Sequence, residues 1–83
     1  MSREYDRLRA SRVAVRRQLN EARRAETAAR LALRRTRITD PPDMVAATQR
    51  QYATAQEAVE VATLALDAIQ RDLHALALTS MTH

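Results

Sequence analysis

The chain has 83 residues, a net charge of +4, no glycine and no cysteine. A chain of this length forms one small domain, whose core is marginal unless disulfides, metal ions or self-association add to it. Without cysteine there are no disulfides, and His74 and His83 have no thiolate partners and do not lie at the spacing of metal ligands. We therefore expect one domain over residues 1–83, no cofactor, and self-association.

The composition favours long helices. Alanine, arginine and leucine dominate, phenylalanine and tryptophan are absent, and all 14 cationic residues are arginines. This arginine bias favours a GC-rich bacterial or phage genome as the source. No apolar stretch follows the N-terminal charges, and no apolar run approaches the roughly 20 residues of a membrane span. We expect a soluble, cytoplasmic protein with no membrane contact.

Helix-breaking residues gather in one segment, residues 39–43, which reads Thr-Asp-Pro-Pro-Asp. Proline suits the first turn of a helix, and Asp40 with Asp43 resembles a capping box built from carboxylates. The sequence therefore predicts one helix at about residues 3–38, a turn at 39–43, and a second helix at about 41–78.

Beyond these helices, the tail at residues 79–83 is expected to be frayed.

Each helix carries a 3-4 repeat of apolar positions, the pattern of a coiled-coil seam. In the first helix the repeat is Tyr5, Leu8, Arg12, Val15, Leu19, Ala22, Glu26, Ala29, Leu33 and Thr36. In the second it is Val45, Thr48, Tyr52, Ala55, Val59, Ala62, Leu66, Ile69, Leu73 and Leu76.

A hairpin that turns after Asp40 pairs positions whose residue numbers add to about 81. In this register large residues face small ones, such as Leu19 opposite Ala62, as a filled interface requires. We expect an all-α, antiparallel coiled-coil hairpin. Its predicted core is Leu8, Val15, Leu19, Ala22, Leu33, Tyr52, Val59, Leu66, Ile69 and Leu73. Arg12 and Glu26 interrupt the seam; they either fix its register or partner, or, in the favoured interpretation, reach sideways to solvent.

Five arginines recur every seven residues beside the first seam. They are Arg9, Arg16, Arg23, Arg30 and Arg37. The first predicted helix has twelve arginines and four acidic residues, whereas the second has two arginines and five acidic residues. The favoured interpretation is a solvated edge, partly neutralised by acids of the second helix or of a second copy. The alternative is a basic stripe that contacts the phosphates of a nucleic acid.

The other edge carries small apolar residues from both helices. The predicted self-association face is Ala25, Ala28, Ala32, Ala58, Val61, Ala65 and Ala68. Small side chains allow helices to approach closely, and a long apolar stripe is seldom left exposed. We expect a homodimer that forms an antiparallel four-helix bundle. The competing interpretations are a helix of another protein on this stripe, or alanine serving helix propensity alone.

Residues for catalysis are missing. There is no cysteine or lysine nucleophile, and the absence of glycine excludes a loop that cradles phosphate. We therefore expect no enzyme, no small-molecule substrate and no metal site. The sequence predicts a structural or adaptor protein that acts through self-association and protein contacts, with a nucleic-acid-associated accessory protein as the alternative.

Overall fold

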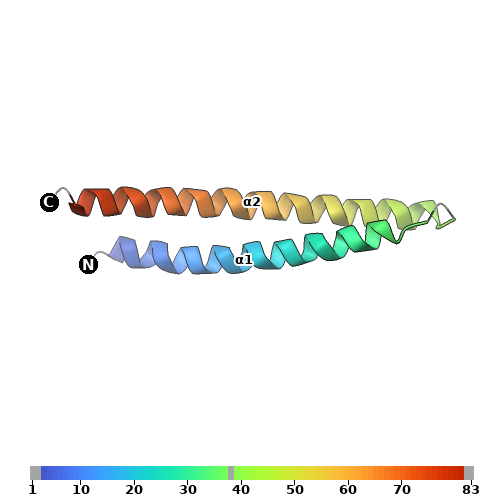
Figure 1. The fold of residues 1–83 in the computed structure, drawn as a ribbon, viewed down its shortest axis with the longest axis horizontal. Helices are drawn as coiled ribbons and strands as arrows, with labels where there is room; N and C mark the ends of the chain where they lie inside the picture. Colours follow the sequence, from blue (N-terminus) through green and yellow to red (C-terminus); the bar gives the residue numbers. More distant parts are fainter. Residues whose placement is uncertain (1–2, 38, 82–83) are drawn as a thin grey trace.

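The protein is an antiparallel helical hairpin, shown here in a computed structural model that describes residues 3–37 and 39–81. Helix α1 spans Arg3–Arg34 and helix α2 spans Pro42–Met81, and the described residues include no strand. The two helices run side by side in opposite directions, so that the start of α1 and the end of α2 lie at the same end of the molecule (Figure 1). This is the architecture that two repeats and one breaker segment predict.

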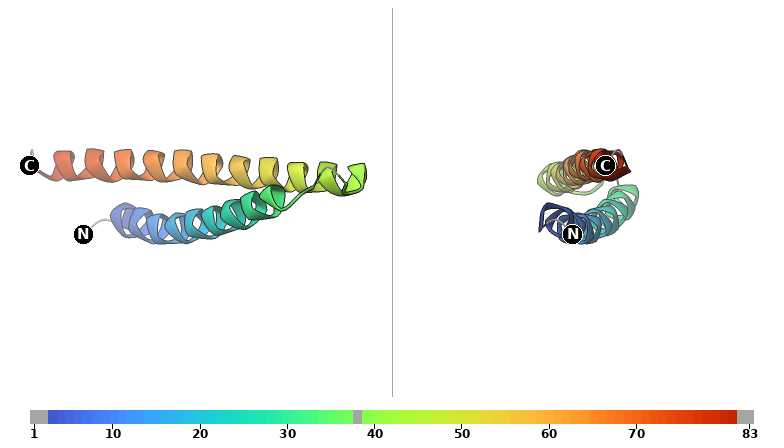
Figure 2. Two further views of the ribbon diagram at one scale, coloured as in Figure 1. Left: turned by 45° about the vertical axis from the view of Figure 1, so that its right-hand side comes forward. Right: turned by 90° about the vertical axis from the view of Figure 1, so that its left-hand side faces the viewer.

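The hairpin is long and thin. Its dimensions are 67 × 15 × 15 Å and its radius of gyration is 18.8 Å, whereas a compact domain of this length has a radius of about 12 Å. Helix α2 is nearly straight, while α1 curves with its convex side away from α2 (Figure 2). Gentle curvature of this sense is usual for a helix with one packed and one solvated side. Each helix therefore has a single neighbour along its length.

The line of contact between the helices follows the two predicted repeats. Every member of both repeats is at least partly buried, and four are buried: Leu19, Ala55, Ala62 and Leu73. Leu19 and Leu73 belong to the ten predicted core residues, and the other eight are half-buried. Leu19 and Ala62 lie opposite each other in the predicted register, where the large side chain on one helix meets a small one on the other.

Threonine hydroxyls in the contact are satisfied within their own helix. Thr48 donates to the carbonyl oxygen of Met44 at 3.0 Å, and Thr63 donates to that of Val59 at 2.8 Å. Such bonds to the residue four positions earlier leave only the methyl group to face the other helix. Polar Thr48 can therefore occupy a seam position without leaving an unpaired group.

The helix ends differ from the prediction. Helix α1 stops at Arg34 rather than at about residue 38, and α2 runs from Pro42 to Met81 rather than from about 41 to 78. Within the tail expected to be frayed, residues 79–81 are helical, and residues 82–83 lie outside the described part, as does residue 38. Helix α2 continues because Ala77, Leu78 and Met81 favour helix and no glycine or proline interrupts them.

Asp40 explains both the early end of α1 and an error in the predicted cap. Its carboxylate accepts a hydrogen bond from the backbone N–H of Arg37 at 2.6 Å, and its own N–H donates to the carbonyl oxygen of Arg37 at 3.0 Å. This closed turn uses an N–H that a longer α1 would need. Asp40 thus faces back toward α1, and the predicted Asp40–Asp43 capping box is wrong.

Pro41 takes the capping position of α2 instead. Its carbonyl oxygen accepts the first helical hydrogen bonds, from the N–H groups of Met44 at 3.0 Å and Val45 at 3.2 Å. Pro42 is therefore the first helical residue, where the missing N–H of proline has no consequence. Asp43, in the first turn, places a negative charge at the positive end of the helix dipole.

Replacing Leu19 by glutamate tests the seam. Leu19 is only 5% exposed, so Leu19→Glu places a charge where no partner is available and should cost more than about 3 kcal/mol of unfolding free energy. Thermal melting followed by circular dichroism should show loss of the cooperative transition. In the control Val13→Glu the replaced side chain is 56% exposed, and the melting temperature should change little. Equal melting of both variants would contradict this packing.

Candidate interaction surfaces

The predicted self-association face, called here the alanine face, forms two adjoining shallow grooves between α1 and α2. The first groove is lined mainly by alanines of both helices, including Ala25, Ala28, Ala32 and Ala58. The second continues along the hairpin past Ala58, Val61 and Ala65. The fold thus brings six of the seven predicted residues together. Ala68 is exposed on α2 and lines neither groove.

The apolar character of this side extends past the alanines. Val61 lines the second groove and is 61% exposed, and Leu64, also 61% exposed, lies one turn further on α2. The whole chain exposes 6789 Å², whereas a compact monomer of 9.4 kDa exposes about 5,000 Å². The difference exceeds the roughly 800 Å² that each partner contributes to an ordinary stable interface. The hairpin therefore has ample surface for a partner.

The predicted arginine edge, made of Arg9, Arg16, Arg23, Arg30 and Arg37, is exposed at all five positions. Near the turn, Arg37 and Gln49 line one shallow groove, which places an arginine of this edge beside a glutamine of α2. At the other end, the guanidinium of Arg9 lies 5.8 Å from the centroid of the Tyr5 ring, within the range of a cation–π contact. Asp40 lines the same groove and places an acidic group near Arg37, whereas Arg16 and Arg23 form no ion pair with a described residue.

Arg30 differs from the rest of the edge because it has an acidic partner. Its Nη2 donates to Oε1 of Glu26 at 2.8 Å, the one ion pair among the described residues. Hydrogen bonding to Glu26, and then to Tyr52, raises the pKa of Arg30. The contact with Tyr52 joins α1 to α2 and is not among the predictions, although the register places both residues at one level. Glu26 thus reaches sideways out of the seam, as the favoured interpretation has it.

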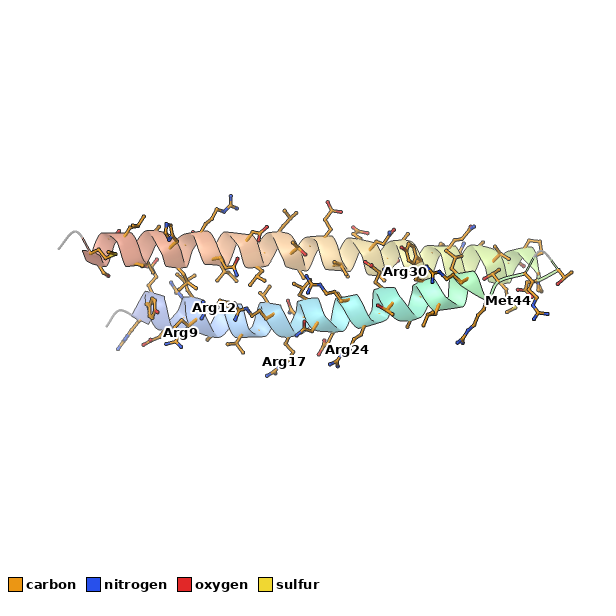
Figure 3. The ribbon with its side chains drawn as sticks, in the orientation of Figure 1. Arg9, Arg12, Arg17, Arg24, Arg30 and Met44 are labelled. Atoms are coloured by element: carbon orange, nitrogen blue, oxygen red, sulfur yellow. The ribbon has the colours of Figure 1, made fainter. Side chains whose placement is uncertain are left out.

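Arg12 behaves differently from Glu26. The side chain is half-buried, and its Nε atom is buried with no hydrogen-bond partner. The favoured interpretation, in which Arg12 simply reaches solvent, therefore holds for only part of the side chain. A buried N–H without a partner costs about 1–3 kcal/mol. Figure 3 shows the contrast with Arg17 and Arg24, which project from the side of α1 opposite α2.

Replacing Arg12 by leucine should therefore stabilise the hairpin. Arg12→Leu removes the unpaired N–H and keeps an apolar side chain in the seam, which should add about 1 kcal/mol and raise the melting temperature by several degrees. Arg17→Leu is the matched control, since Arg17 is exposed and has no buried polar atom that lacks a partner. Chemical denaturation would measure both. A less stable Arg12→Leu would show that the guanidinium contributes more than it costs.

Metal ligands do not converge anywhere in residues 3–37 and 39–81. This part of the chain holds no group of three or more histidine, cysteine, aspartate or glutamate side chains that could bind a metal ion. His74 lies on the exposed side of α2 beside Asp67 and Arg71. Neither α1 nor α2 contains an apolar segment of the length needed to cross a membrane.

Comparison of the chain with models of protein families, with curated proteins and with solved structures finds no match.

Proposed function

We propose that this chain is a non-enzymatic interaction module, a helical hairpin that self-associates through the alanine face and acts as a structural or adaptor protein. The observation that carries the proposal is the pair of apolar grooves that both helices line together. Alanine at these positions lets a second pair of helices approach closely, and the product is an antiparallel four-helix bundle. A monomer would leave these grooves and the neighbouring Val61 and Leu64 in water.

The sequence and the grooves give little support for a catalytic function. The sequence contains no cysteine or lysine nucleophile, and without glycine it has no loop of the kind that cradles phosphate. Most residues that line the grooves are alanines, and the titratable ones, Arg50 and Glu57, line different grooves. Grooves of this type suit helices as partners, and a second copy supplies two with the same small side chains.

Replacing Ala58 by glutamate tests the self-association. Ala58 lines both grooves and is exposed in the hairpin, so Ala58→Glu should leave the fold intact while placing a charge in the centre of the interface. Light scattering should give about twice 9.4 kDa for the unmodified protein and 9.4 kDa for the variant. Circular dichroism should show that the variant remains helical.

Gln56→Glu is the matched control, because Gln56 is also exposed on α2 but lies outside both grooves. It should remain a dimer. A monomeric unmodified protein at high micromolar concentration would rule out self-association. It would leave a helix of another protein as the occupant of the alanine face.

A second function is favoured by the arginine edge. Arg16 and Arg23 are exposed and have no acidic partner in the described part of the chain. The four members on α1, from Arg9 to Arg30, stand about 10 Å apart along the helix, close enough for several to contact one nucleic-acid backbone. We propose as the alternative that the hairpin is a nucleic-acid-associated accessory protein that binds phosphates through this edge.

Charge reversal separates this alternative from a solvated edge. Arg16→Glu combined with Arg23→Glu should abolish salt-sensitive binding to DNA or RNA, as measured by fluorescence anisotropy at two salt concentrations. Arg30 is left unchanged because it pairs with Glu26. The control, Arg17→Glu with Arg71→Glu, changes the net charge equally on the outer sides of the helices and should retain most of the binding. No binding by the unmodified protein would eliminate the alternative.

A further inference from the structure

A second copy can cover the alanine face in two symmetric ways. If the two-fold axis runs parallel to the helices, both turns lie at the same end, and α1 of each copy packs on α2 of the other. If the axis runs across the helices, the turns lie at opposite ends, α1 packs on α1, and α2 packs on α2. Both arrangements bury the same grooves, so the apolar residues alone do not choose between them.

The opposite net charges of the two helices favour the first arrangement. Helix α1 carries ten arginines and four acidic residues, a net charge of +6, whereas α2 carries two arginines and five acidic residues, a net charge of −3. The first arrangement places each positive helix beside a negative helix of the other copy. The second places two helices of charge +6 against each other, which costs free energy through repulsion.

Individual residues at the rim of the alanine face give the same answer. An axis parallel to the helices keeps every residue at its own level, so Arg24 of α1 meets the residues of the partner that lie level with it in its own hairpin. In the register that pairs numbers adding to about 81, that residue is Glu57. Glu57 lines the second groove together with Ala22 and Ala58, so it stands at the edge of the face. The two-fold axis forms this pair twice.

The other arrangement brings like charges together. Reversing one hairpin end for end lays the two copies of α1 against each other, so the arginines on their outer sides, among them Arg17 and Arg24, come to the same edge of the assembly. Both arginines are exposed and project from the side of α1 opposite α2 (Figure 3). Like charges in contact act against a complex.

We propose that two copies of this hairpin pack with both turns at the same end, so that α1 of each lies on α2 of the partner. The occupant of the alanine face is then a second copy, chosen in its orientation by the opposite charges of the two helices. The inference rests on the proposed self-association, and the experiment below separates a failure of one from a failure of the other.

Spin labels at the two ends of the hairpin measure the arrangement directly. The chain has no cysteine, so Thr39→Cys at the turn and Ser80→Cys near the end of α2 each give a single labelled site per subunit. Both side chains are exposed. Pulsed electron paramagnetic resonance on the dimer should give short distances for both labels, roughly 15–30 Å including the label arms, since neighbouring helix axes lie about 8–10 Å apart.

The outcomes are distinct. Distances close to the 67 Å length of the hairpin for both labels would overturn the proposed arrangement while leaving the dimer in place. A protein that light scattering shows to be monomeric would overturn the self-association itself. A single short distance with the other long would indicate a staggered or open assembly and would also overturn the arrangement.

Charge exchange at the rim gives a second, independent readout. Arg24→Glu should raise the dimer dissociation constant about tenfold, because the introduced carboxylate would face Glu57 of the partner subunit at two places. Glu57→Arg added to Arg24→Glu should restore the affinity. In the opposite arrangement Arg24→Glu would instead tighten the dimer, since it would reduce the repulsion between two copies of α1 that each carry a net charge of +6. Tighter association of the single variant would therefore overturn the proposal.

Discussion

Two helices that have only each other as neighbours can bury only the side chains along the line where they meet. In this hairpin that line contains four buried residues, which are still 5–8% exposed, and none of the described side chains reaches complete burial. The core is therefore a single row of layers, in some of which a larger residue faces a smaller one, as Leu19 faces Ala62. All other features of the molecule lie on one side or the other of this row.

The narrow core also explains how the chain tolerates charged residues within its seam. Glu26 lies close enough to solvent to pair with Arg30, and its side chain stays 22% exposed. Arg12 extends a longer stem along the same seam and leaves its Nε atom buried without a partner. In a coiled coil, such a residue lowers stability and disfavours alternative registers, which an all-apolar seam would permit. Arg12 fits this description, because its buried Nε atom lacks a hydrogen-bond partner, which lowers stability, while its charge disfavours other registers.

The hairpin and its seam could be predicted from the sequence, because the 3-4 repeats and the single breaker segment act through steric rules that hold for any helix pair. The helix ends could not. Asp40 stands next to two prolines, where either its N-cap role or a turn back to Arg37 satisfies its carboxylate. The choice depends on backbone geometry that residue type alone does not fix. The alanine face was predictable as a set of residues, but its division into grooves depends on both helices together.

The alanine face and the arginine edge lie on opposite sides of the seam, which makes their roles separable. A substitution such as Ala58→Glu changes the groove side, while Arg16 and Arg23 stand on the other side and keep their exposure. In the proposed dimer, association through the alanine face would leave the arginine edge of each copy uncovered, so the dimer would present two such edges. The net charge of α1 would orient the second copy, and the uncovered arginines would remain available to an anionic partner.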